Sequence, residues 1–183
     1  FTRLLILSIS IILIKKGEKI LFEKDIKKNT KQFYNMNSIN EILFDMHHNF
    51  DYKSILEVKP KSQIIFFSDL YIDSSEIEHL LNTLSSKEIK GTIVQILDPI
   101  EKLLPFRGNL SFESLEDKKV HNISDLEAVK DEYYSMLQKH KTNIQKATDK
   151  YGWSFISHCT DEEPILCIIN LLKSLTKKRV KFA

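Results

Sequence analysis

Apolar and polar residues form blocks along the chain whose lengths match those of strands and helices. Four large apolar residues, Ile64–Phe67, lie between Pro60 and a polar cluster, a pattern typical of a strand buried on both faces of a parallel sheet. Behind the cluster, apolar residues recur over Ile77–Leu84 with the spacing of one helix face, and Ser75 stands at the position of a helix cap. We therefore predict a strand, a polar tip and a helix, which Lys90-Gly91 is expected to end.

The same reasoning predicts further elements on both sides of this unit. Strands are expected in three other apolar segments: Glu18–Glu23, Thr92–Leu97 and Trp153–His158. Helices are expected where apolar residues follow helical spacing: Leu4–Ile14, Ser38–Met46, Ser124–Lys150, and the segment after Thr160-Asp161 with Ile165, Ile168, Ile169, Leu172 and Leu175 inward. A short hairpin is expected within Phe112–Val120, and Gly17 and Gly152 are expected to end helices.

Strands that alternate with helices in this way predict an α/β fold with a doubly wound, mostly parallel sheet and helices on both faces. With 183 residues, of which 42% are hydrophobic, the chain is long enough for one domain with a substantial core. We expect residues 1–176 to form this domain and residues 177–183 to form a basic C-terminal tail. The net charge of +2 gives no indication of nucleic-acid binding.

Two features bear on the compartment. Leu4–Ile14 is apolar, but it is shorter than the roughly 20 residues that a membrane-spanning helix needs. Lysines and Gly17 follow it where a signal peptide would have small residues, so we expect a core helix without membrane contact. Cys159 and Cys167 lack metal-binding spacing and stand in apolar surroundings, which predicts buried thiols in a reducing compartment. We therefore expect a cytoplasmic protein.

The polar tip of the strand at Ile64–Phe67 carries the best candidate site. Ligands of open α/β sheets bind at the carboxyl ends of the strands, where Ser68 and Asp69 are expected, with Asp73 just behind them. Carboxylate and hydroxyl oxygens are suitable ligands for Mg²⁺. Asp73 and Ser75 also have the positions of helix caps, and Asp69 has that of a turn-forming residue. Both interpretations stay open from the sequence.

An enzyme is the alternative interpretation. The segment Ser68–Tyr71 resembles the Ser-Asp-Leu-His opening of the metallophosphoesterases, but Tyr71 stands at the position of the ligating histidine, and the later motifs of that family are absent. The chain also has no phosphate-binding glycine loop. A metal-dependent phosphoesterase or nuclease that uses Asp69, Asp73 and Asp98 is therefore the alternative to a non-enzymatic protein.

Several short segments are weak signals singly but specific in their order and spacing. They are Phe67-Ser68-Asp69, Gln95-Ile96-Leu97-Asp98-Pro99, Leu104-Pro105-Phe106-Arg107-Gly108, Phe112-Glu113 with Leu115-Glu116, a long helix with Tyr133 or Tyr134 and His140, and Thr160-Asp161. In these features residues 1–176 resemble a bacterial family named domain of unknown function fifty-eight. These are von Willebrand factor A-like proteins that are usually encoded beside MoxR-type AAA+ ATPases.

The resemblance implies a sheet of the von Willebrand factor A type, which is Rossmann-like, with a metal-ion-dependent adhesion site at its C-terminal edge. Asp69 would take the third ligand position of this site, with Ser68 beside it. The first strand and its Asp-x-Ser-x-Ser loop would precede Phe1, so the resemblance implies a fragment that lacks its first strand. Thr30 and Ser38 are weak candidates for the second ligand position. Mg²⁺ would bind the full-length protein, and this fragment feebly or not at all.

The resemblance also implies a non-enzymatic interaction scaffold that works with a MoxR-type ATPase in the assembly or maturation of a client. The segment Leu104–Leu115 is additional to a minimal A-domain, and we expect partner contacts there through Phe106 and Arg107, with Asp98 nearby. The guanidinium of Arg107 can pair with a carboxylate through two hydrogen bonds. A turn-shaping role for Arg107 stays open, as does a third interpretation, a remnant without function.

Overall fold

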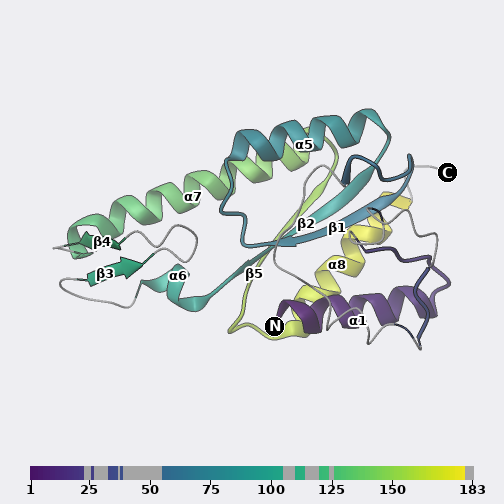
Figure 1. Ribbon diagram of the computed structural model, residues 1–183, viewed down its shortest axis with the longest axis horizontal. Helices are drawn as coiled ribbons and strands as arrows, with labels where there is room; N and C mark the ends of the chain where they lie inside the picture. The colour runs from purple at the N-terminus through teal and green to yellow at the C-terminus, as the bar shows by residue number, and fades with distance from the viewer. Residues whose placement is uncertain are drawn as a thin grey trace.

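The computed structural model describes residues 1–22, 26, 33–36, 38, 55–104, 110–113, 120–123 and 126–179. Its centre is a parallel three-stranded sheet in the order β1-β2-β5, built from β1 (Gln63–Ser68), β2 (Lys90–Leu97) and β5 (Ser154–Cys159) (Figure 1). Both pairings are parallel, so the carboxyl ends of the three strands meet at one edge. The predicted parallel sheet is confirmed for the described residues.

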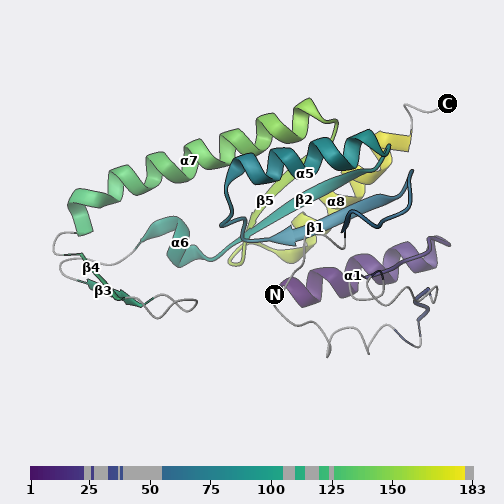
Figure 2. The ribbon, with the colours of Figure 1, turned by 45° about the horizontal axis from the view of Figure 1, so that its top comes forward.

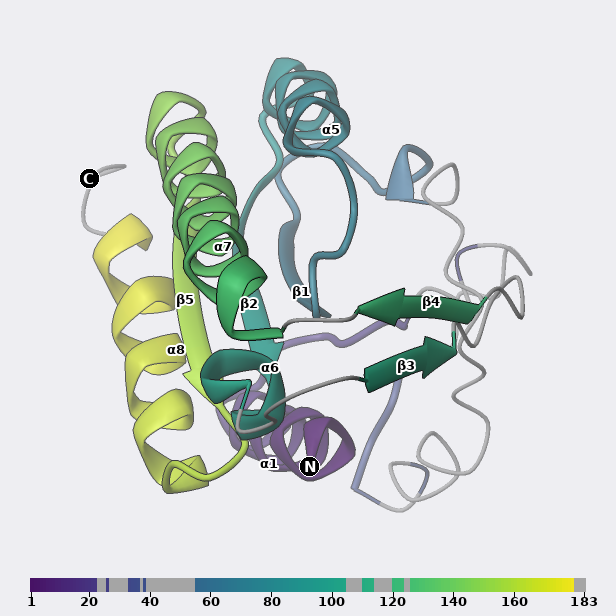
Figure 3. The same ribbon diagram turned by 90° about the vertical axis from the view of Figure 1, so that its left-hand side faces the viewer.

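Helices cover both faces of this sheet (Figures 2 and 3). α5 (Ser74–Ser86) and α7 (Leu126–Lys150) lie side by side over one face, and α1 (Thr2–Lys15) and α8 (Pro164–Arg179) cover the other. The connections from β1 to β2 and from β2 to β5 therefore place their helices on the same face. This arrangement is compatible with a Rossmann-like fold and confirms the predicted α/β class. α8 extends to Arg179, beyond the predicted domain end at residue 176.

A second, smaller unit lies between β2 and α7. The chain first forms α6 (Pro99–Leu103) and then an antiparallel hairpin of β3 (Leu110–Glu113) and β4 (Val120–Ile123). The hairpin lies beyond the C-terminal edge of the parallel sheet, near the start of α7 (Figure 1). The hairpin predicted within Phe112–Val120 is confirmed, with strands that extend further out than expected.

Alternate residues of β1 contribute to two separate cores. Ile64 and Phe66 pack into the core beneath α5 and α7, whereas Ile65 and Phe67 pack into the core beneath α1 and α8. The sequence predicted full burial on both faces, but these residues are only half-buried. The reason is that β1 is an edge strand among the described residues, whereas β2 is central and carries the fully buried Val94.

The first predicted helix is confirmed, and its inward face packs against α8 and the sheet. Leu5 and Ile9 are buried in the core that α1 and α8 share. Within the described part of the chain, no helix is both long and apolar enough to cross a membrane. The prediction of a strand at Glu18–Glu23 is wrong for residues 18–22, which the structure describes and which form no strand. The N–H of Glu18 instead closes the end of α1 by donating to the Leu13 carbonyl.

Four of the described helices end at a residue with positive φ that follows the last turn, and after α6 this residue is Leu104 (φ 37°). Gly17 (φ 83°) has this position after α1 and Gly152 (φ 69°) has it after α7, as predicted. After α5 the position is taken by Glu88 (φ 58°), whose N–H donates to the carbonyl of Ser85. A residue other than glycine therefore ends α5.

The prediction that Lys90 and Gly91 end α5 is wrong, because both residues lie in β2. Gly91 is required there for a packing reason. A Cβ atom at this position would come closer than 3.0 Å to the carbonyl oxygen of Ile64 and to the ring of Trp153. The glycine thus lets the indole ring cross directly over the central strand.

The buried face of α8 differs from the predicted one. It is formed by Cys167, Ile168, Leu171 and Leu175. Ile165 and Ile169 were expected to face inward but are 54% and 40% exposed. On the same face of the helix, the buried hydroxyl of Ser174 meets that of Thr92 in β2 at 2.9 Å, so both hydroxyls are satisfied within the contact with the sheet.

Candidate functional site

The turn after β1 is held by its own polar side chains. Ser68 Oγ accepts the N–H of Leu70 at 3.0 Å and donates to the Asp69 carboxylate at 3.3 Å. The same carboxylate accepts the N–H of Tyr71 at 3.3 Å. These bonds stabilise a left-handed conformation at Leu70 (φ 64°), which is unfavourable for a side chain of this size. Ser68 and Asp69 therefore have a turn-forming role, which was one of the two interpretations of Asp69.

Two side chains from other elements anchor this turn. Gln95 of β2 is buried and donates from Nε2 to the backbone carbonyl of Asp69 at 3.3 Å. His140 of α7 places Nε2 2.8 Å from the backbone carbonyl of Leu70. The sequence placed His140 on the inward stripe of its helix but gave it no role at the strand tip. The available signal for Gln95 was a single amide within an apolar strand.

Asp73 and Asp98, the other two carboxylates of the predicted site, cap helices. Asp73 accepts the N–H of Ser75 at 2.8 Å, and this hydrogen bond lowers the pKa of Asp73. Asp98 accepts the N–H of Ile100 at 2.8 Å, while its own N–H donates to the Glu101 carboxylate at 3.3 Å. The N-cap of α5 is therefore Asp73, one of the two predicted cap residues, and not Ser75.

The residues at this edge do not by themselves fit a Mg²⁺ site. The strand tip offers one carboxylate, from Asp69, and one hydroxyl, from Ser68, and both already serve the turn. No group of three or more His, Cys, Asp or Glu side chains in the described ranges could hold a metal ion. An ion at Asp69 would need ligands from the part of the chain outside those ranges, where Thr30, Phe106 and Arg107 also lie. Ser38 is described, and its side chain bonds Asn35 in a local turn.

Aromatic side chains lie beside the turn. The Tyr71 side chain reaches the side chains of Glu101 in α6 and Tyr133 in α7. The hydroxyl of Tyr133 in turn donates to the Glu101 backbone carbonyl at 3.0 Å. Burial of the Tyr71 hydroxyl, with Tyr133 and Glu101 beside it, raises the pKa of Tyr71 above its ordinary value. The residue as a whole is nevertheless 59% exposed.

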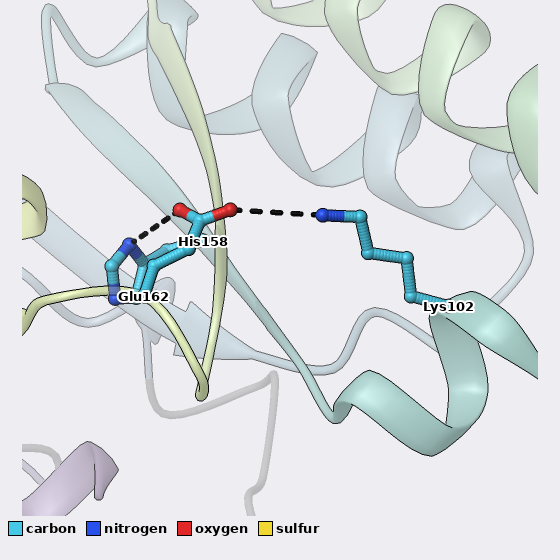
Figure 4. A network of polar contacts seen from close by, with 3 residues as sticks. All are labelled: Lys102, His158 and Glu162. Atoms are coloured by element: carbon cyan, nitrogen blue, oxygen red, sulfur yellow. Dashed lines mark ion pairs between the residues drawn. The ribbon is translucent and has the colours of Figure 1, made fainter.

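The tip of β5 carries a separate polar network (Figure 4). His158 is buried, and its Nδ1 lies 3.3 Å from the Glu162 carboxylate, which is 3.7 Å from Nζ of Lys102 in α6. The ring of Phe1 stacks on the imidazole with the ring centroids 5.4 Å apart. This network ties α6 and the start of α1 to the end of β5, and thereby fixes the edge from its far side.

The chain matches no protein-family model and no curated protein. Among solved structures, it is similar to the crystal structure of an uncharacterized membrane spanning protein from Vibrio fischeri. The two share 15% sequence identity and a TM-score of 0.29, over 78% of this chain and 67% of that one. A TM-score this low carries no argument about fold or function.

Proposed function

We propose that this chain is a non-enzymatic protein-interaction domain of the von Willebrand factor A type. It would be cytoplasmic and, as the sequence resemblance implies, would work with a MoxR-type AAA+ ATPase in the assembly or maturation of a client. The parallel sheet with helices on both faces is compatible with this fold, and the C-terminal edge of the sheet supports the interaction role.

One observation carries the proposal, a contact surface at this edge that we call the Tyr71 surface. It consists of Asp69, Tyr71, Asp98, Ile100, Glu101 and Leu103. Its three large apolar members, Tyr71, Ile100 and Leu103, are 59%, 51% and 56% exposed. The turn after β1 and the cap of α6 hold them in place, so little conformational entropy is lost when a partner covers them. Tyrosine is one of the residues that dominate the binding energy of protein interfaces, and the aliphatic side chains around it add apolar contact area.

The same edge offers little for catalysis. Each of the three carboxylates of the enzymatic alternative accepts a backbone N–H, and Asp73 and Asp98 do so as helix caps. Hydrolysis of a generic phosphodiester in the presence of Mg²⁺ or Mn²⁺, lost in Asp69→Ala, would overturn the non-enzymatic proposal.

The proposal is tested by mixing the purified chain with a MoxR-type ATPase of the same organism and measuring complex formation by analytical ultracentrifugation. We expect a complex with the wild type and with Glu57→Gln, a control at an exposed carboxylate far from this edge. Tyr71→Ala and Ile100→Ser should weaken the complex about tenfold or more. Circular dichroism checks that both variants fold. Equal binding by all four proteins would contradict the role of this surface.

A contribution of Mg²⁺ is tested in the same assay with a full-length protein. A chelator should weaken the complex if a metal ion bridges the two proteins, and Asp69→Ala should then have the same effect. Equal affinity with and without chelator would exclude a metal bridge and leave direct side-chain contacts as the source of binding.

A further inference from the structure

Building on the proposed function, we infer that the Tyr71 surface binds a segment of a partner protein that carries arginine and aliphatic side chains. The inference concerns the chemistry of the partner, which neither the fold nor the sequence resemblance specifies. It depends on the charge around the exposed ring of Tyr71 and on the aliphatic side chains next to it.

The surface is continuous, because contacts link its members. Asp69 accepts the N–H of Tyr71, the Tyr71 side chain reaches Glu101, and the Glu101 carboxylate accepts the N–H of Asp98. Ile100 and Leu103 are three positions apart on α6 and extend the surface along that helix. Tyr71 is thus linked to the carboxylates of Asp69 and Glu101, and Ile100 and Leu103 are exposed on the helix that carries Glu101.

The three carboxylates of this surface are not neutralised within the described part of the chain. None of Asp69, Asp98 and Glu101 forms an ion pair with a described cation. Lys102, the nearest lysine in sequence, is 3.7 Å from Glu162 on the β5 side of α6. Lys130 lies 5.8 Å from the centroid of the Tyr134 ring, in α7. Among the described residues, the surface therefore has three carboxylates without a paired cation close to Tyr71.

An arginine side chain matches this arrangement better than other groups do. Its guanidinium can stack on an exposed aromatic side chain such as Tyr71 and donate two parallel hydrogen bonds to a nearby carboxylate. Aliphatic side chains next to it would cover Ile100 and Leu103. Nucleic acids and anionic membranes carry negative charge and would be repelled by the same carboxylates, so a protein segment is the occupant that the charge favours.

The inference is tested with two fluorescein-labelled peptides of equal length, measured by fluorescence anisotropy against the full chain. One peptide alternates arginine with leucine, and the other has glutamate in place of every arginine. We expect that only the arginine peptide binds, and that its affinity falls as the salt concentration is raised. Tyr71→Ala and the double variant Asp69→Asn/Glu101→Gln should each weaken it about tenfold, whereas Glu57→Gln and Tyr71→Phe should change it less than about twofold. Tyr71→Phe keeps the ring and removes only the hydroxyl.

Each other outcome overturns the inference in a recognisable way. No binding of the arginine peptide, or binding that these variants leave unchanged, excludes a cationic segment at this surface. Preference for the glutamate peptide would also overturn it and would favour a partner carboxylate at a metal ion. Sedimentation that shows the chain associating with itself, lost in Tyr71→Ala, would make a second copy the occupant. The ATPase assay described above tests the proposed function independently. A complex with the ATPase that is lost in Tyr71→Ala but unaffected by the double variant would support the proposed function and contradict the cationic partner.

Discussion

Nε2 of His140, in the middle of α7, lies 2.8 Å from the backbone carbonyl oxygen of Leu70, directly after β1. Leu70 is completely buried and has a left-handed backbone. The long helix α7, which follows the central strand β2 along the chain, thus fixes the turn after β1.

We expect His140→Ala to lower the free energy of unfolding by about 1 to 2 kcal/mol, because the carbonyl of Leu70 loses its side-chain partner in a partly buried position. Urea unfolding followed by circular dichroism measures this change. The matched control is His79→Ala, which removes an exposed histidine from α5 and should change stability by less than about 0.5 kcal/mol. Equal effects of the two substitutions would show that the bond to Leu70 contributes nothing.

Gly91→Ala should destabilise the chain by about 1 to 3 kcal/mol or more, since the added methyl group meets the Ile64 carbonyl and the Trp153 ring. Thermal unfolding followed by tryptophan fluorescence would also report the displaced indole, because Trp153 is the one tryptophan of the chain. Gly17→Ala is the comparison. No atom lies within 4 Å of a Cβ there, so only backbone strain of roughly 1 kcal/mol is added. A larger loss in Gly17→Ala than in Gly91→Ala would contradict this packing argument.

Glu88→Gly should stabilise the chain by about 0.5 to 1 kcal/mol. Glycine relieves the left-handed strain at the end of α5, and this gain exceeds its added entropy in the unfolded chain. The midpoint of urea unfolding should rise with an unchanged slope. Glu88→Ala keeps the strain and should leave the midpoint where it is, so a rise in both variants would point to the lost charge as the cause.

Burial raises the pKa of the Cys167 thiol to about 11 and also raises that of Cys159. The thiolate is the reactive form, so iodoacetamide at a pH of about 8 should modify neither cysteine until the chain is unfolded in guanidinium chloride. Mass spectrometry counts the modified thiols. Rapid modification of Cys167 in the folded protein would contradict its burial.

The same shift has a consequence for stability. A thiol whose pKa is raised by folding contributes stability below its ordinary pKa, and this contribution is lost as the pH rises toward about 11. The melting temperature should therefore fall over this range. Cys167→Ala should show a smaller fall, and an identical fall in both proteins would assign the effect to other groups.

The sequence could predict the elements that depend on local signals. Gly17 and Gly152 end helices because glycine alone takes positive φ without strain, and the apolar run at Ile64–Phe67 forms a strand as expected. Local signals could not decide between two residues that both have a suitable position for a helix cap. Asp73 and Ser75 are both good caps, and only the structure shows that Asp73 accepts the N–H. Glu88 gave no signal at all, because its left-handed backbone is imposed by the return of the chain into β2.

The candidate site depended more on tertiary structure than the fold did. Ser68 and Asp69 could be placed at a strand tip from the apolar run before them. Gln95 and His140 come to the same tip from β2 and from the middle of α7, and no spacing along the chain measures those distances. Tyr71 was noted only as a departure from a metallophosphoesterase motif. Its exposure depends on α6, whose position the sequence did not specify.

The central place of β2 also affects how the chain is made. As it leaves the ribosome, β1, α5 and β2 can assemble first, but the second neighbour of β2 is β5, which follows α6, the hairpin and the 25 residues of α7. Until Ser154 has been synthesised, one edge of the most buried strand has no partner. Unpaired edges of this kind recruit other nascent chains. A polypeptide released before β5 should therefore aggregate, and the interval between β2 and β5 is when this protein most needs a chaperone.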